Sequence, residues 1–340
     1  MTDKLLAQLK KDLGDDKAYA ASEVPDVKVI STGSVTLDFA TGIGGFARGT
    51  LNEVFGPESI GKTTLSYYMI AEAQKCGLYG AFVNLEGRFS AAWANKVAGV
   101  NLDELLVVSP DPGSEAVETT AKIVNSGGIG IVIFDSIGAM VGDREQEPGE
   151  KKQAGGQSAL VTQMVKMLLV PAARNLTTVV FLNQVRDVFG AAVPMVESPG
   201  GHALKHAASI RVQLKPTRDK IYDTIAGEKK EVGYRVAAFV KKNKLAAPKQ
   251  VANYQFVHDQ VDGLTLGIDR SGEVIDLALR LAIIERAGAM YRHDTFPDGQ
   301  IKGKDATIEF IRSDEQVFNK IRREVMSLAS KQPEGVETLV

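Results

Sequence analysis

Short apolar runs alternate with helical patterns along the first two thirds of the chain. The apolar runs, typical of buried strands, occupy residues 51–55, 80–85, 105–109, 129–135 and 177–183. Helical patterns lie between the early runs, at Thr64–Cys76, Ser90–Val97 and Ser114–Asn125. Continuous Val, Ile and Phe runs separated by helices predict an α/β fold whose mostly parallel sheet is covered by helices on both faces. Two later runs, at residues 208–214 and 234–240, follow each other more closely and indicate an antiparallel extension.

Both ends of the chain depart from this alternation. Leucines recur at helical spacing at positions 5, 6, 9 and 13, which predicts a short amphipathic helix that must dock on its own body or on a neighbouring subunit. After about residue 271 the pattern predicts a small C-terminal domain rich in helices, and residues 272–293 read as one strong amphipathic helix with a glycine stop. We therefore divide the chain into an N-terminal arm (1–29), a core (30–270), the C-terminal domain (271–330) and a flexible tail (331–340).

The composition is that of a globular protein in a reducing compartment. Hydrophobic residues make up 44% of the 340 residues, which is enough for a core of good size. The one cysteine, Cys76, can form no internal disulfide, and we interpret it as a structural thiol. We find no signal peptide and no apolar run long enough to cross a membrane, so we expect a cytoplasmic protein without a membrane partner. The net charge of -2 excludes a uniformly basic sheath for nucleic acid.

A phosphate-binding spacing separates the first predicted strand from the first predicted helix. Residues 56–63 read G-x-x-x-x-G-K-T. In such a loop the backbone N–H groups surround phosphate oxygens, and the N-terminus of the following helix adds its positive end. Lys62 is placed to reach the β and γ phosphates, and Thr63 to bind Mg²⁺. The spacing therefore predicts a nucleoside triphosphate site, with ATP and Mg²⁺ as cofactors, at Gly56, Pro57, Glu58, Ser59, Ile60, Gly61, Lys62, Thr63 and Thr64.

Polar side chains end three of the later apolar strands. Asp135 ends one strand, where a carboxylate can support Mg²⁺ together with Thr63. Glu86 follows another strand and could orient or deprotonate a water molecule, although an exposed strand-end glutamate would look the same. Gln184 ends a third strand, where its amide could sense a γ-phosphate or could simply begin a turn.

Two polar segments and one basic segment suggest contacts with a large anionic partner. Residues 142–157 and 186–201 contain glycines, and both begin just after the C-terminal end of a predicted strand, where parallel sheets bind ligands. Residues 215–250 hold ten Lys or Arg residues against four Asp or Glu residues. This positive excess is either a solvated hairpin or a surface that meets DNA phosphates or the ATP of a neighbouring subunit.

Taken together, these segments resemble the RecA family of bacterial and phage recombinases from about residue 30 to about residue 330. The resemblance rests on motifs in order: STGSVTLDFATGIGGFARGTLNEVFGPESIGKTTL, IVIFDSIGAM, FLNQVRDVFG with ESPGGHALKHAASIRV, VKKNKLAAP and IIERAGAMY. It implies a RecA-like phosphate-loop core, an N-terminal polymerisation arm and a small C-terminal domain. The run NLEG at Glu86, and Ala159 where the family usually has an arginine, mark a divergent member of cellular or phage origin.

The resemblance implies an ATPase that forms helical filaments on single-stranded DNA and exchanges strands with homologous double-stranded DNA. It assigns water activation to Glu86 and γ-phosphate sensing to Gln184, and it implies that Lys242 and Lys244 contact the ATP of the adjacent subunit. Further implied nucleotide contacts are Ser90, Trp93 (near adenine), Asp135 and Ser136. The implied DNA-binding residues, in or beside the two polar segments, are Gly155, Thr162, Lys166, Arg186, Gly200, Gly201 and His202.

Two other functions remain possible for such a sequence. A hexameric helicase or a processing factor would carry the same phosphate loop, although the predicted terminal regions are unusual for a helicase. A filament or regulatory protein with a degenerate site is the second alternative, because NLEG departs from the family pattern at the catalytic glutamate.

Overall fold

The computed structural model describes residues 8–12, 27–87, 89–142, 156–187, 196–197, 199–225, 227–261 and 264–329. A nine-stranded sheet runs through it in the order β13-β12-β11-β10-β3-β7-β6-β4-β5. The strands are β3 (Leu51–Gly56), β4 (Tyr79–Asn84), β5 (Leu105–Val108), β6 (Ile129–Asp135), β7 (Thr178–Gln184), β10 (Ile210–Ile225), β11 (Glu228–Asn243), β12 (Val251–Val257) and β13 (Gly267–Ile268). Strands β10 to β5 are parallel, and β10 to β13 pair antiparallel. The predicted α/β fold with a mostly parallel sheet is confirmed.

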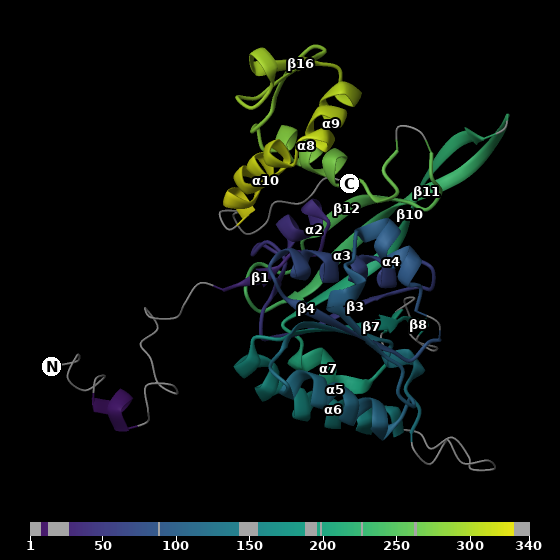
Figure 1. Ribbon diagram of the computed structural model, residues 1–340, viewed down its shortest axis with the longest axis vertical. Coiled ribbons are helices and arrows are strands. Elements are labelled where there is room, and N and C mark those ends of the chain that lie inside the picture. The colour runs from purple at the N-terminus through teal and green to yellow at the C-terminus, as the bar shows by residue number, and fades with distance from the viewer. Residues whose placement is uncertain are drawn as a thin grey trace.

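Helices cover both faces of this sheet (Figure 1). One face carries α3 (Lys62–Lys75) and α4 (Ala91–Ala98), and the other carries α5 (Ser114–Asn125), α6 (Gly156–Asn175) and α7 (Gly201–Ala207). Side chains of β6 alternate between the two cores: Ile131 and Ile133 join the core beneath α3, while Val132 and Phe134 join the core beneath α5 and α6. A strand buried on both faces needs apolar residues at every position, which explains its unbroken apolar run.

The segment before the phosphate loop contains an element that the sequence pattern did not predict. Strand β1 (Val29–Ile30) pairs with β2 (Phe46–Ala47), and the short helix α2 (Val35–Ala40) lies between them. Ser34 caps this helix by accepting a hydrogen bond from the backbone N–H of Leu37. Residues 8–12 are helical, and the rest of the predicted N-terminal helix lies outside the described residues.

The C-terminal domain contains three helices and a small sheet. The helices are α8 (Arg270–Arg280), α9 (Lys304–Ser313) and α10 (Glu315–Ala329), and the strands are β14 (Glu285–Ala287), β15 (Met290–Arg292) and β16 (Gln300–Lys302). Short 3₁₀ turns occur here at Pro297–Gly299, and in the core at Leu102–Glu104 and Ile137–Ala139.

The prediction of one amphipathic helix over residues 272–293 is wrong in its second half. Helix α8 ends at Arg280, and Ala282 has a φ of 55°, which a right-handed helix cannot accommodate. The chain then forms the β14–β15 hairpin, which turns at Gly288 with a φ of 62°. Ile284 is buried in the core of the C-terminal domain, so this apolar residue of the pattern is buried although it does not lie on a helix.

Strands β10 and β11 form a hairpin longer than the sequence predicted. Each strand has 16 residues, and the far half of the hairpin projects beyond the body of the molecule (Figure 1). At the same, carboxyl end of the sheet, β7 is followed by the two-residue strand β8 (Arg186–Asp187), which pairs with β9 (Val196–Glu197).

Candidate nucleotide and DNA sites

The phosphate loop connects β3 to α3, and the side chain of its lysine folds back onto the loop. Gly61 begins α3 with a φ of 89°, and Ser59 also has a positive φ, 58°. The Nζ atom of Lys62 donates hydrogen bonds to the carbonyl oxygens of Gly56 (3.1 Å) and Pro57 (2.7 Å). Burial lowers the pKa of Lys62, and the carboxylates around it partly oppose this shift. The loop thus holds one cation at the position where phosphate chemistry needs it.

Two oxygen donors stand beside that lysine. The hydroxyl of Thr63 donates a hydrogen bond of 2.9 Å to Asp135, which is buried at the end of β6. Burial, followed by the nearby charge of Glu86, raises the pKa of Asp135 to about 6. A hydroxyl and a carboxylate in contact are hard oxygen ligands of the kind that Mg²⁺ takes beside a nucleotide, so these residues fit the predicted ion.

Glu86 and Gln184 meet at the edge of the same site. The side-chain amide of Gln184 donates a hydrogen bond of 3.1 Å to Oε1 of Glu86, and the hydroxyl of Ser136 donates to the same oxygen. Gln184 ends β7, and the chain continues directly into β8. Residues far apart in sequence are thereby joined, because β4, β6 and β7 are adjacent parallel strands with their carboxyl ends at one edge.

A cavity of about 440 Å³ contains these groups. It is lined by Glu58, Ser59, Gly61, Lys62, Thr63, Thr64, Glu86, Trp93, Asp135, Gln184, Tyr234 and Phe256. Of the other predicted nucleotide contacts, Ile60 is buried beneath the loop, and Ser90 caps α4 by accepting a hydrogen bond from the N–H of Trp93. Tyr234 and Phe256 come from β11 and β12, and no motif in the sequence pointed to them.

Most of the predicted DNA-binding residues that the structure describes lie on α6 or at the start of α7. Thr162 and Lys166 line a shallow groove on α6. Gly200 and Gly201 have φ values of 99° and 73°, and a Cβ on Gly200 would lie 2.9 Å from a methyl group of Ile137. The double glycine therefore lets the chain turn tightly against its neighbours. His202 is exposed, whereas Gly155 and the side chain of Arg186 lie outside the described residues.

Lys242 and Lys244 contact the end of α7. Nζ of Lys242 donates hydrogen bonds of 2.7 Å to the carbonyl oxygens of Lys205 and His206, and Nζ of Lys244 donates one of 3.1 Å to Ala207. The last carbonyls of a helix lack partners within it and carry its negative end, so the two ammonium groups stabilise α7. Burial and the charge of Lys244 lower the pKa of Lys242.

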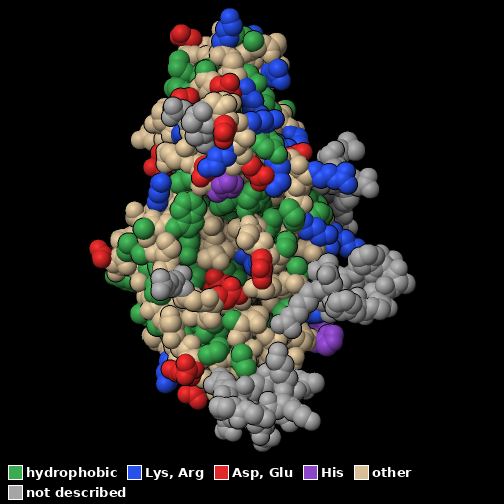
Figure 2. Space-filling view, turned by 90° about the vertical axis from the view of Figure 1, so that its right-hand side faces the viewer, with side chains coloured by type: hydrophobic (Ala, Val, Ile, Leu, Met, Phe, Trp, Pro, Cys, Tyr) green, Lys and Arg blue, Asp and Glu red, His purple; other side chains and the backbone are tan. Residues whose placement is uncertain are grey.

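Charge is distributed unevenly over the surface near this site. Figure 2 views the molecule from the right-hand side of Figure 1, toward which the β10–β11 hairpin projects. Acidic side chains lie beside a hollow near the middle of this face, and Lys and Arg side chains gather along one edge of its upper half. Residues 215–250 include most of this hairpin, so their basic excess lies largely on an element that projects beyond the body of the molecule.

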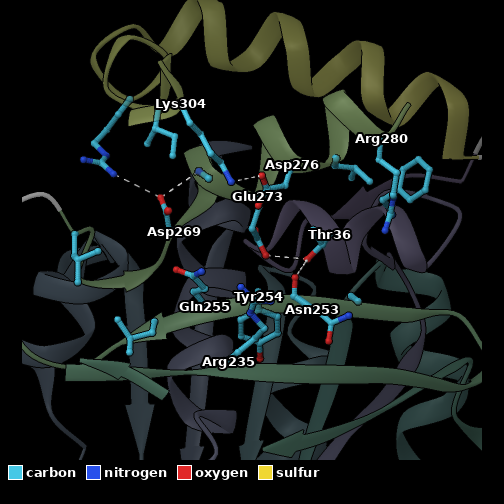
Figure 3. Close-up of a pocket in the computed structure, with 18 of the residues that line it drawn as sticks. Thr36, Arg235, Asn253, Tyr254, Gln255, Asp269, Glu273, Asp276, Arg280 and Lys304 are labelled. Carbon is cyan, nitrogen blue, oxygen red and sulfur yellow. Dashed lines mark hydrogen bonds and ion pairs between the residues drawn. The ribbon is translucent and has the colours of Figure 1, made fainter. Parts of the chain in front are cut away.

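Figure 3 shows a second, larger cavity of about 970 Å³. It separates β12 and α2 of the core from α8 and α9, and it shares no lining residue with the cavity at the loop. On its wall Glu273 of α8 accepts hydrogen bonds from the N–H of Val35 and from the hydroxyl groups of Ser34 and Thr36. These contacts attach the C-terminal domain to the first turn of α2.

A glycine-containing loop that holds a buried lysine at the carboxyl edge of a parallel sheet, beside a Thr–Asp pair, defines a phosphate-loop NTPase. The family model described as the RecA N-terminal domain matches residues 1–263 of the chain. Protein RecA of Rickettsia canadensis (strain McKiel) is 35% identical over 331 residues, which are 96% of this chain and 92% of that protein. Protein RecA of Caldanaerobacter subterraneus subsp. tengcongensis is 37% identical over 325 residues, 94% and 91% of the two chains. The chain belongs to the RecA family.

Family membership confirms the predicted class of activity. The protein is a RecA recombinase, with DNA strand exchange and DNA-dependent ATP hydrolysis as its activities. Its partners are DNA and other copies of the chain, as in the family generally. The helicase alternative loses its support. Among the described residues, no helix combines the length and apolar character needed to cross a membrane.

Proposed function

We propose that the cavity at the phosphate loop binds ATP with Mg²⁺, and that the state of this nucleotide controls a filament of the chain on single-stranded DNA. The observation that carries the proposal is the hydrogen bond between Gln184 and Glu86. It joins the group proposed to activate water to the strand that leads into the second DNA-facing segment, residues 186–201.

Five residues of the cavity have specific roles in this proposal. Lys62 would leave its two loop carbonyls to contact the β and γ phosphates, and Thr63 and Asp135 would hold Mg²⁺. Mg²⁺, when bound, supplies positive charge that stabilises the charge developing on the transferred phosphoryl group. Glu86 would orient and deprotonate the attacking water, and Gln184 would exchange its bond to Glu86 for one to the terminal phosphate.

The interface between subunits would form around the same nucleotide. Lys242 and Lys244 would release the carbonyls of α7 and contact the ATP of the adjacent chain. A ligand that binds only the assembled state stabilises that state by mass action, so ATP would favour the filament and its hydrolysis would favour release. Because α7 directly follows the second DNA-facing segment, the exchange would also alter the DNA surface.

Single-stranded DNA would lie along the segments 142–157 and 186–201. The contacts would come from Gly155, Thr162, Lys166, Arg186, Gly200, Gly201 and His202. Backbone amides and basic side chains hold phosphates without reading sequence, which suits a protein that must accept any strand. Base pairing with the homologous duplex would then supply the specificity.

Two measurements on the purified chain test this function together. ATP hydrolysis should rise when single-stranded DNA is added, and electron micrographs with ATP and single-stranded DNA should show helical filaments. Ring-shaped particles that unwind forked DNA would support the helicase alternative instead. A chain that forms filaments on DNA but never hydrolyses ATP would support the regulatory alternative.

A further inference from the structure

Tyr234 of β11 contacts the phosphate loop from the sheet side. Its hydroxyl donates a hydrogen bond of 2.8 Å to the carbonyl oxygen of Ser59. A Cβ placed on Gly61 would have this hydroxyl as its nearest neighbour, at 3.8 Å. The phenol therefore stands at the end of the loop where α3 begins, and it lines the same cavity as Lys62.

The carbonyl that Tyr234 binds belongs to a loop residue with an unusual backbone conformation. Ser59 has a φ of 58°, in the left-handed region, which is unfavourable for a residue with a side chain. A residue keeps such a conformation only where its surroundings fix it. The hydrogen bond from Tyr234 is one such constraint, and it fixes the orientation of the carbonyl of Ser59.

The position of Tyr234 is itself well fixed. Its ring packs against Phe256, the residue paired with it on β12, with the ring centroids 5.5 Å apart. On the other side it pairs with Lys220 of β10, whose Nζ lies 5.9 Å from the ring centroid. The hydroxyl is thus presented to the loop by a three-stranded part of the sheet and not by a mobile segment.

We propose that Tyr234 is a positioning residue for nucleotide binding, which holds the phosphate loop in its binding conformation through the carbonyl of Ser59. The inference rests on the proposed function, in that the loop receives the phosphates of ATP. It adds a residue from β11, the strand that also carries Lys242 and Lys244. One strand would then support the phosphate loop of its own subunit and contact the nucleotide of the next.

The hydroxyl keeps its proton over the working range of pH. Burial, followed by the charge of Glu231, raises the pKa of Tyr234 to about 12. The donor to Ser59 is therefore present at neutral and at moderately alkaline pH, and its contribution to binding should not change between pH 6.5 and pH 9.

The variant Tyr234→Phe removes this donor and keeps the ring. Trp93 is the only tryptophan of the chain and lines the cavity, so its fluorescence reports nucleotide binding directly. We expect the dissociation constants for ATP and ADP to rise by the same factor, about 3- to 10-fold for one hydrogen bond. KM for ATP should rise with them. The loop binds the phosphates equally well in the ground state and in the transition state, so kcat should stay within about twofold of wild type.

An experiment without nucleotide tests whether Tyr234 holds the loop, whether or not the chain binds ATP. Amide hydrogen exchange at residues 59–62 of the nucleotide-free protein should be faster in Tyr234→Phe than in wild type. The matched control is Tyr222→Phe, a change in an exposed tyrosine of the same hairpin, and it should leave both affinity and exchange unchanged. Unchanged exchange at the loop, or faster exchange with unchanged nucleotide affinity, would overturn the role of Tyr234. A wild-type chain that binds no ATP would overturn the proposed function, while the exchange experiment would still decide whether Tyr234 holds the loop.

Discussion

At the scale of single residues, one carboxylate oxygen has two donors. Oε1 of Glu86 accepts from the amide of Gln184 and from the hydroxyl of Ser136, so its position and orientation are set by two neighbouring strand ends. A general base needs such fixed geometry, because its efficiency depends on the distance and direction to the water it activates. With the departure NLEG from the usual family run, the carboxylate proposed to activate water is still held by two donors.

The variant Glu86→Gln tests this role. It keeps the size of the side chain and removes the base, so hydrolysis should fall by about 100-fold or more, while ATP and DNA should still bind. The measurements are the steady-state ATPase rate with single-stranded DNA and the fluorescence of Trp93 on titration with ATP. Glu118→Gln, which changes an exposed carboxylate on α5, is the matched control. Hydrolysis at the wild-type rate in Glu86→Gln would remove Glu86 from the mechanism.

The sequence predicted the part of the site that a local pattern encodes. The phosphate loop, Asp135, Glu86 and Gln184 all follow apolar strands, and parallel pairing brings these strand ends together. Tyr234 was not predictable, because an aromatic residue in an antiparallel strand is ordinary and its contact with Ser59 spans 175 positions. A long-range contact of this kind leaves no periodic signal in a single sequence.

At the scale of elements, α7 depends on a strand that follows it. Its last carbonyls are bound by Lys242 and Lys244 of β11, and its first residues continue the double-glycine turn at Gly200 and Gly201. The lysines were predicted to serve an adjacent subunit, and within one chain they cap this short helix. Helices of seven residues are marginal alone, so removal of the cap should loosen the whole element.

Changing both lysines to alanine should therefore have two effects. Loss of the charged cap should lower the unfolding free energy by about 1 kcal/mol, measured by chemical denaturation of the single chain. Filament-dependent ATP hydrolysis should disappear, whereas nucleotide binding by the single chain should persist. Lys241→Ala, which changes an exposed lysine next to Lys242, should leave stability and turnover close to wild type. Unchanged turnover in the double variant would contradict the role proposed across the interface.

At the scale of the whole molecule, buried carboxylates join the C-terminal domain to the core. Glu273 of α8 binds the first turn of α2, and Asp38 of α2 forms an ion pair of 2.9 Å with Arg322 of α10. Both carboxylates are buried, so each attachment is polar within a largely apolar junction. The C-terminal domain was predicted from its apolar pattern. These attachments were not predicted, because a single carboxylate on a helix does not indicate which distant residue it will contact.

Glu273 should make the stability of the molecule depend on pH. Burial raises its pKa to about 8, and the nearby Asp38 adds to this shift, whereas an unfolded glutamate has a pKa of about 4.3. Between these two values the folded chain keeps a proton that the unfolded chain has released, so stability should fall as pH rises toward 8 and change little above it. Glu273→Gln should flatten this fall in Tm between pH 6 and pH 9.

The control for this pH dependence is Asp276→Asn, which changes a more exposed carboxylate on the same helix. Asp276 forms an ion pair with Lys304 at the surface of the larger cavity, so its substitution should keep the wild-type slope of Tm against pH. Parallel slopes for the wild type and for Glu273→Gln would show that Glu273 does not carry the effect.

In the proposed filament, each nucleotide site is completed by two copies of the chain. Mixing equal amounts of Glu86→Gln and of the Lys242→Ala, Lys244→Ala double variant on single-stranded DNA tests this arrangement. Each variant alone lacks one half of every site, but a mixed filament places intact Glu86 beside intact lysines. With random order in a head-to-tail filament, we predict about one quarter of the wild-type ATPase rate. A mixture that hydrolyses no more ATP than the two variants measured separately would contradict the account.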